Sequence, residues 1–182
     1  MTIKDQNNPL FDKFLKHLFD CRDTDNLIIK GHILTEYAMN YYIELSSIEK
    51  INLNESRFTY SNKIDIVKMF GLFKKHTTLN NELKLLNKLR NSIAHKLKYD
   101  EQILIEFLRG FENYRKAFKL DKLDHLDIND EIFYELDDEK ITVKGSHLLL
   151  MFYISIICVT IFSSSESITQ IAGHNSSSKK IN

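Results

Sequence analysis

LLLMFYISIICVTIF, residues 148–162, contains no charged side chain and is the longest apolar stretch of the chain. Its fifteen residues are fewer than the roughly 20 that a helix needs to cross a bilayer. The stretch therefore predicts a helix buried at the centre of a folded domain, with a membrane segment as the alternative. The polar, Ser-rich residues that follow, 166–182, are expected to form a solvated C-terminal tail, and residues 1–165 the domain itself.

Amphipathic segments that come before the apolar stretch are expected to pack around it as helices. Apolar residues recur at helical spacing in each of them, and the first begins with Asn8-Pro9, a favourable helix start. The segments are residues 9–19, 26–46, 58–73, 81–95 and 101–118. Five glycines and one proline are too few for an all-β protein with many tight turns. The sequence thus predicts an all-α antiparallel helical bundle.

The region just before the apolar stretch is acidic and has a different pattern. Residues 121–139 hold nine carboxylates and one lysine, Lys122. Here IFYEL (132–136) and ITVKG (141–145) alternate well enough to predict a small β-hairpin before the last helix.

The bulk composition is that of one soluble globular domain. The 182 residues are 43% hydrophobic, and 25 basic side chains balance 25 acidic ones, so the whole chain has no field that steers it to nucleic acid. The two cysteines, Cys21 and Cys158, predict neither a disulfide framework nor a zinc site. Because the N-terminus lacks the apolar core of a signal peptide, a cytoplasmic protein is expected. No cofactor is expected either.

One basic region departs from this balance. LNKLRNSIAHKLKYD, residues 86–100, ends a predicted helix, and no acidic residue lies between Glu82 and Asp100. The positive charges in this interval are Lys84, Lys88, Arg90, Lys96 and Lys98. A solvated basic face is one interpretation of such a run. An anion-binding surface is the other, with Lys88, Lys96 and Lys98 as binding residues.

Arg90, Asn91 and His95 supply the candidate chemistry of this region. Asn91 and His95, four residues apart, share a helix face, so the amide can orient the imidazole. Arg90 and His95 point roughly 140° apart, so the helix must end near His95, or a second subunit must complete the site. A guanidinium suits a phosphate, and an imidazole can exchange a proton near neutral pH. Together they suit metal-independent cleavage of an RNA phosphodiester.

A purely structural interpretation of the same residues is also open. Arg90 would pair with a carboxylate such as Glu36, which lies among isoleucines on the second face of helix 26–46 and is expected to contact another helix or another subunit. Asn91 and His95 would cap the end of their helix. A Glu36 that faces solvent is the further alternative. His32, His76 and His147 lack ligand spacing and are expected to be ordinary surface or core histidines.

The hexapeptide Arg90-Asn91-Ser92-Ile93-Ala94-His95 resembles the Arg-x4-6-His signature of the HEPN superfamily, in the variant that begins Arg-Asn. Upstream, Lys63-Ile64-Asp65, Phe70-Gly71-Leu72 and the paired Leu86 and Leu89 resemble the mannitol operon repressor (MltR-like) branch. The resemblance covers about residues 10–162. Phe70 stands where that branch often has a smaller apolar residue, and the acidic region 121–139 has no counterpart in the family pattern.

The resemblance implies a HEPN-like bundle that commonly forms a homodimer, with Arg90 and His95 of both subunits facing one cleft. Many HEPN proteins are RNA endonucleases of the toxin or antiphage type. In such a protein His95 would be the general acid or base, Arg90 would hold phosphate, Asn91 would orient His95 and Glu36 would support the site; an antitoxin or other regulatory protein would be a partner. The MltR-like branch is named for repression, which implies instead a noncatalytic transcription regulator or protein-binding module.

Overall fold

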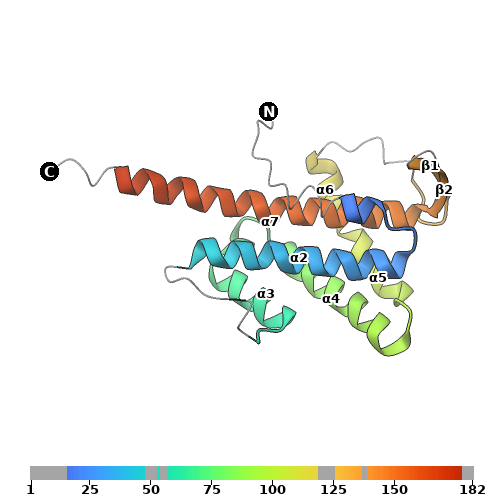
Figure 1. Cartoon of the computed structure of the whole chain (residues 1–182), viewed down its shortest axis with the longest axis horizontal. Helices are drawn as coiled ribbons and strands as arrows, with labels where there is room; N and C mark the ends of the chain where they lie inside the picture. The colour runs from blue at the N-terminus through green and yellow to red at the C-terminus, as the bar shows by residue number, and fades with distance from the viewer. Residues whose placement is uncertain (1–15, 48–52, 54–56, 119–125, 137–138, 178–182) are drawn as a thin grey trace.

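The computed structural model describes residues 16–47, 53, 57–118, 126–136 and 139–177 and is a bundle of helices with one small hairpin (Figure 1). In chain order the elements are α2 (Thr24–Ser46), α3 (Tyr60–Met69), the 3₁₀ helix η1 (Leu72–Lys74), α4 (Leu79–Lys96), α5 (Glu101–Arg109), α6 (Phe111–Phe118), β1 (Glu131–Leu136), β2 (Glu139–Lys144) and α7 (Gly145–Ser177). The prediction of a mostly helical fold with a hairpin before the last helix is confirmed.

The apolar stretch forms the central part of α7, which runs along the length of the bundle with α2 beside it (Figure 1). Its side chains are buried where they face the other helices: Leu150, Tyr153, Ile154, Ile157, Cys158 and Ile161. Full burial of one aliphatic or aromatic side chain contributes on the order of 1.5–3 kcal/mol. The prediction of a central buried helix over residues 148–162 is therefore confirmed.

α7 is longer than predicted at both ends, because it begins at Gly145 and continues to Ser177. Much of the expected C-terminal tail, 166–182, is therefore helical as far as Ser177. The segment Gly145–Ser165 is also long and apolar enough to cross a membrane, but half of it is buried inside the protein, and the core helix of a soluble domain has the same properties.

α2 packs closely on α7 because a glycine faces it. A Cβ on Gly31 would overlap Cδ1 of Ile154 and would lie 3.1 Å from its Cγ2. Farther along, the rings of Tyr37 and Tyr41 on α2 lie 6.1 and 5.4 Å from the ring of Phe162 on α7. These contacts hold α2 in the orientation from which its other side meets α3 and α4.

The start of α2 is fixed by a side-chain cap and by a buried histidine from α7. The carboxylate of Asp23 accepts a hydrogen bond from the backbone amide of Asn26 at 2.7 Å. His147 is 2% exposed; its Nε2 donates to the carbonyl of Cys21 at 3.0 Å, and its Nδ1 lies 3.3 Å from the hydroxyl of Thr24. Most of the first predicted helix, residues 9–19, lies outside the described residues. Residues 16–19 are described and are helical.

The predicted helix 101–118 is two helices, α5 and α6, which meet at Gly110. A Cβ on Gly110 would overlap the hydroxyl oxygen of Tyr153, so the close approach of α7 requires a glycine at this junction. The predicted helix 58–73 also divides, because Gly71 adopts a left-handed φ of 89° between α3 and η1. A left-handed residue ends an α-helix and is most favourable as glycine.

The hairpin pairs β1 with β2 in antiparallel register, with Glu131 opposite Lys144 and Leu136 opposite Glu139. Ile141 and Val143 of β2 are buried, whereas Phe133 of β1 is 70% exposed. Thr142, which is opposite Phe133, is exposed as well, so the hairpin turns one face towards the protein and the other towards solvent.

Candidate functional site

The candidate site lies at the C-terminal end of α4, which stops at Lys96, one residue after His95. Leu97 ends the helix in the left-handed conformation, with φ 58° and ψ 19°. Arg90 and His95 are exposed, and Asn91 is half-buried. The sequence required the helix to end near His95 if the three side chains were to reach one ligand, and the structure meets that condition.

Asn91 contacts the arginine of the site and not the histidine. Its Oδ1 accepts a hydrogen bond from Nη1 of Arg90 at 3.3 Å. Within the described part of the chain, no hydrogen bond joins Asn91 to His95. In the single chain no described contact therefore supports a role for Asn91 in orienting His95, and that role stays a prediction.

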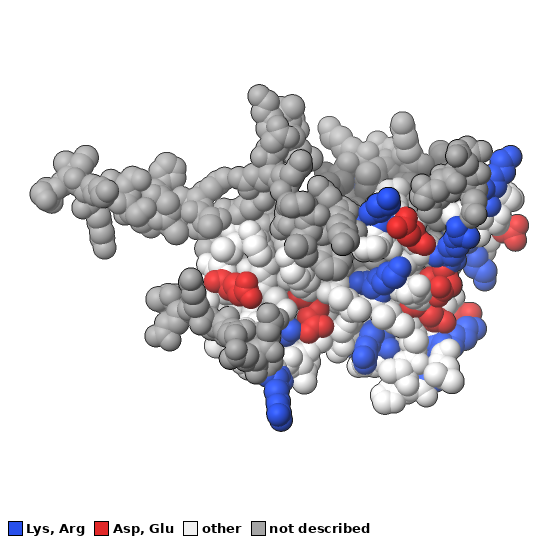
Figure 2. Space-filling model, viewed as in Figure 1, with Lys and Arg blue, Asp and Glu red and all other residues white. Residues whose placement is uncertain are grey.

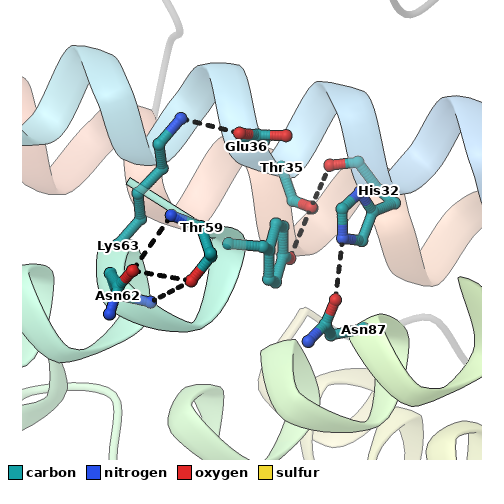
Figure 3. A network of polar contacts seen from close by, with 8 residues as sticks. His32, Thr35, Glu36, Thr59, Asn62, Lys63 and Asn87 are labelled. Carbon is teal, nitrogen blue, oxygen red and sulfur yellow. Dashed lines mark hydrogen bonds and ion pairs between the residues drawn. The ribbon is translucent and has the colours of Figure 1, made fainter. Parts of the chain in front are cut away.

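Glu36 pairs with a lysine of α3 and not with Arg90 (Figure 3). The Nζ of Lys63 donates to Oε1 of Glu36 at 2.6 Å, and the lysine side chain is only 7% exposed. The expectation that Glu36 contacts another helix is confirmed, and the alternative in which it neutralises Arg90 is not what the structure contains. Among the described residues no carboxylate forms an ion pair with Arg90.

His32 is part of this region, although the sequence did not single it out. It is 7% exposed, its ring stacks on that of Tyr60 at 3.9 Å, and its Nε2 donates to Oδ1 of Asn87 at 3.1 Å (Figure 3). Asn87 precedes Arg90 by one turn of α4, so His32 lies beside the arginine. Thr35 extends the network, because its hydroxyl lies 2.8 Å from that of Tyr60.

Burial lowers the pKa of His32, and the positive charges of Arg90 and Lys63 add to that effect. The hydrogen bond with Asn87 and the charge of Glu36 oppose the shift. A neutral ring is consistent with its donation of a single proton to an amide oxygen. The expectation that His32 is an ordinary core histidine therefore agrees with its burial, and its contacts also make it a support for the surface around Arg90.

The basic residues around the site are not all free of acids. Lys96 lies 3.3 Å from Asp100 and Lys98 lies 3.6 Å from Glu101, so the acidic start of α5 meets the basic end of α4. Figure 2 accordingly shows basic and acidic side chains interspersed over this end of the molecule. Exposed ion pairs of this kind are worth about 1 kcal/mol or less, so an anion can displace the carboxylates. Lys88 is exposed, and no ion pair involves it in the part of the chain that is described.

The described residues contain no group of three His, Cys, Asp or Glu side chains that could hold a metal ion. The arrangement at the end of α4 can bind an anion through Arg90 and exchange a proton through His95, and both are general properties of these side chains. Comparison with protein-family models, with curated proteins and with solved structures gave no match. The resemblance to HEPN proteins accordingly depends on the motif residues of the sequence.

Proposed function

We propose that this protein is a HEPN-like, metal-independent RNA endonuclease of the toxin or antiphage type that acts in the cytoplasm. The observation that carries the proposal is the state of Arg90 and His95. Both are exposed at the end of one helix, core side chains do not cover them, and no carboxylate among the described residues neutralises Arg90. The structural interpretation instead expected Arg90 to pair with a carboxylate such as Glu36, and Glu36 pairs with Lys63.

In the proposed reaction the 2′-hydroxyl of the RNA attacks the adjacent phosphorus and the 5′-oxygen leaves. His95 removes the proton from the 2′-hydroxyl or donates one to the leaving oxygen. Arg90 binds the nonbridging phosphate oxygens and stabilises the charge that develops on them. The exposed Lys88 and, after exchange of their weak ion pairs, Lys96 and Lys98 hold neighbouring phosphates.

A homodimer is part of the proposal because one chain supplies one His95, whereas the reaction uses both a base and an acid. Arg90 and His95 also diverge by roughly 140° around α4, so a second copy related by a twofold axis would complete the cleft. Two apolar side chains of α2 are exposed on the face that continues from His32: Ile29 at 38% and Ile33 at 53%. Exposed apolar residues beside the site are suited to such an interface.

The second candidate function is a noncatalytic transcription regulator or protein-binding module, as in the MltR-like branch. The contact that favours it is the hydrogen bond from Arg90 to Asn91. It engages Oδ1 of Asn91, one of the two polar atoms that could orient His95, so within the described single chain no side chain positions the histidine for acid–base chemistry.

Expression of the wild-type protein and of His95→Ala in growing cells separates the two functions. The nuclease proposal expects arrest of growth and fragmentation of cellular RNA with the wild type, relief by His95→Ala, and no relief by the matched control His17→Ala, another exposed histidine. Arg90→Lys should relieve it in part, because a lysine keeps the charge and loses the planar fork. Identical growth and RNA patterns for wild type and His95→Ala, at equal protein levels, would favour the regulator.

A further inference from the structure

The turn between α3 and η1 exposes apolar and basic side chains together. Met69 and Phe70, at the end of α3, are 85% and 40% exposed, although neither carries a polar group. The three lysines of the turn are exposed as well: Lys68, Lys74 and Lys75. We refer to residues 68–75 as the α3–η1 tip. It belongs to a helix that packs on α2 and α4 at the edge of the bundle (Figure 1).

Several contacts fix the backbone of the α3–η1 tip. Gly71 adopts the left-handed conformation, and Leu72 beside it is buried in the core. The hydroxyl of Tyr42 on α2 donates to the backbone carbonyl of Phe70 at 3.2 Å. The backbone amide of Lys74 donates to the carbonyl of Gly71 at 3.0 Å. The two apolar side chains of the tip are therefore exposed by a folded, hydrogen-bonded turn and not by a frayed helix end.

Acidic residues do not compensate the positive charge of the α3–η1 tip. No acidic residue lies between Asp65 and Glu82 in the sequence. Among the residues that the structure describes, no carboxylate forms an ion pair with any of the three lysines of the tip. Lys96 and Lys98, at the far end of α4, differ in this respect because each lies within ion-pair distance of a carboxylate. Since the whole chain has 25 basic and 25 acidic residues, attraction to an anionic surface would be local to the tip.

Exposed apolar side chains within a basic cluster are the combination that binds the surface of an anionic membrane. We propose that the α3–η1 tip docks this protein on an anionic lipid bilayer. Met69 and Phe70 insert between the headgroups, and the three lysines of the tip contact the phosphates. The attachment is peripheral, because only the tip enters the interface. The anionic leaflet of a cell membrane faces the cytoplasm, where the protein is proposed to act.

A lipid surface accounts for the α3–η1 tip better than RNA or a protein partner does. RNA phosphates would bind the lysines but leave Met69, the more exposed of the two apolar side chains, in water. A specific protein interface buries about 800 Å² on each side, whereas the exposed apolar surface of the tip is limited to two side chains. The tip adjoins the start of α4, and Arg90 and His95 lie roughly 15–25 Å farther along that helix. Membrane docking therefore does not depend on the proposed nuclease site.

Co-sedimentation of the full chain with lipid vesicles tests the charge of the α3–η1 tip. The probes are vesicles of phosphatidylcholine and vesicles of phosphatidylcholine and phosphatidylglycerol in equal parts. Binding to the anionic vesicles alone is expected, and it should be lost when salt rises from about 0.1 M to about 1 M. Each lysine near an anionic surface favours binding about fivefold, so Lys74→Ala with Lys75→Ala should weaken it about twenty- to thirtyfold. The matched control, Lys140→Ala with Lys144→Ala on β2, removes the same charge from exposed positions and should change binding less than about threefold.

The apolar part of the α3–η1 tip is tested in the same assay. Met69→Ser with Phe70→Ser should weaken binding to the anionic vesicles at least about tenfold, because two apolar side chains no longer insert. If this double variant does not fold, Met69→Ser alone, at a position 85% exposed, should still weaken binding at least about threefold. Phe133→Ser is the matched control, because it removes an exposed ring of the hairpin and should leave binding unchanged.

Three kinds of result would overturn the proposal. The first is equal binding to both vesicle compositions, or no binding to either. The second is wild-type binding by the lysine variant or by Met69→Ser. The third is a different occupant: loss of RNA binding in the lysine variant with vesicle binding intact would assign the α3–η1 tip to RNA, and loss of self-association in Met69→Ser would assign it to a second copy of the chain. None of these results depends on cleavage of RNA at His95.

Discussion

Leu97→Gly should stabilise the protein, although it removes a large apolar side chain. Leu97 ends α4 with φ 58° and is 88% exposed, so its side chain contributes little burial. A left-handed backbone costs a non-glycine residue about 1–2 kcal/mol. Glycine adds freedom to the unfolded chain worth about 0.5–1 kcal/mol in the opposite direction. The difference predicts a gain of about 0.5–1 kcal/mol in the free energy of unfolding, or about 1–4 °C in Tm for a chain of this size.

Urea unfolding followed by far-UV circular dichroism measures this gain, and Leu97→Ala is the matched control. Alanine also removes the exposed leucine but retains the left-handed strain, so its free energy of unfolding should equal that of the wild type within about 0.5 kcal/mol. If Leu97→Gly were neutral or destabilising, or if both variants gained equally, the left-handed backbone of Leu97 would not be strained. The description of the helix end beside His95 would then be wrong.

Three other perturbations test the packing and the buried charges. Gly31→Ala should lower the free energy of unfolding by about 1–2 kcal/mol, because the added methyl group overpacks against Ile154. Ile154→Val in the same chain should recover part of the loss. A double-mutant cycle with no coupling energy would contradict the α2–α7 contact. Glu36→Gln should cost more than Lys63→Met, by about 1 kcal/mol in chemical denaturation, because it leaves the charge of Lys63, the more deeply buried partner, without a counter-charge. The reverse order would contradict the pair. Burial raises the folded-state pKa of Glu82 from its ordinary value near 4.5, so its contribution to stability is fully present below that value and is lost as pH rises through the raised pKa. The free energy of unfolding of the wild type should therefore fall relative to that of Glu82→Gln over this pH range. Parallel curves of unfolding free energy against pH would show that the pKa of Glu82 is not shifted.

The sequence predicted the helices well because their core positions repeat every three or four residues. The segments 26–46 and 81–95 match α2 and α4 to within two residues, and the hairpin matches β1 and β2. The break at Gly110 was missed because apolar spacing continues across it, from Phe107 to Phe111. The glycine there is required by the hydroxyl of Tyr153, which lies more than forty residues later in the sequence.

The candidate site was predictable only in its local part. The end of α4 beside His95 follows from the sequence of that helix. The pairing of Lys96 with Asp100 spans the left-handed Leu97, where the helix ends, so their spacing of four does not predict it. The contact of His32 with Asn87 joins residues 55 apart, and that of Glu36 with Lys63 joins residues 27 apart. No pattern within one helix carries such information, because it depends on which faces of α2, α3 and α4 meet.

Cleavage of RNA by the end of α4 without metal is best tested on a defined oligonucleotide. The purified protein is incubated in EDTA with a short RNA and with the same strand carrying 2′-deoxyribose at the cleaved position. The wild type should convert the RNA to fragments with a 2′,3′-cyclic phosphate and leave the deoxy-substituted position intact, and the rate of His95→Ala should be at least about a hundredfold lower. An uncut RNA, a requirement for divalent cations, or equal rates for wild type and His95→Ala would contradict it.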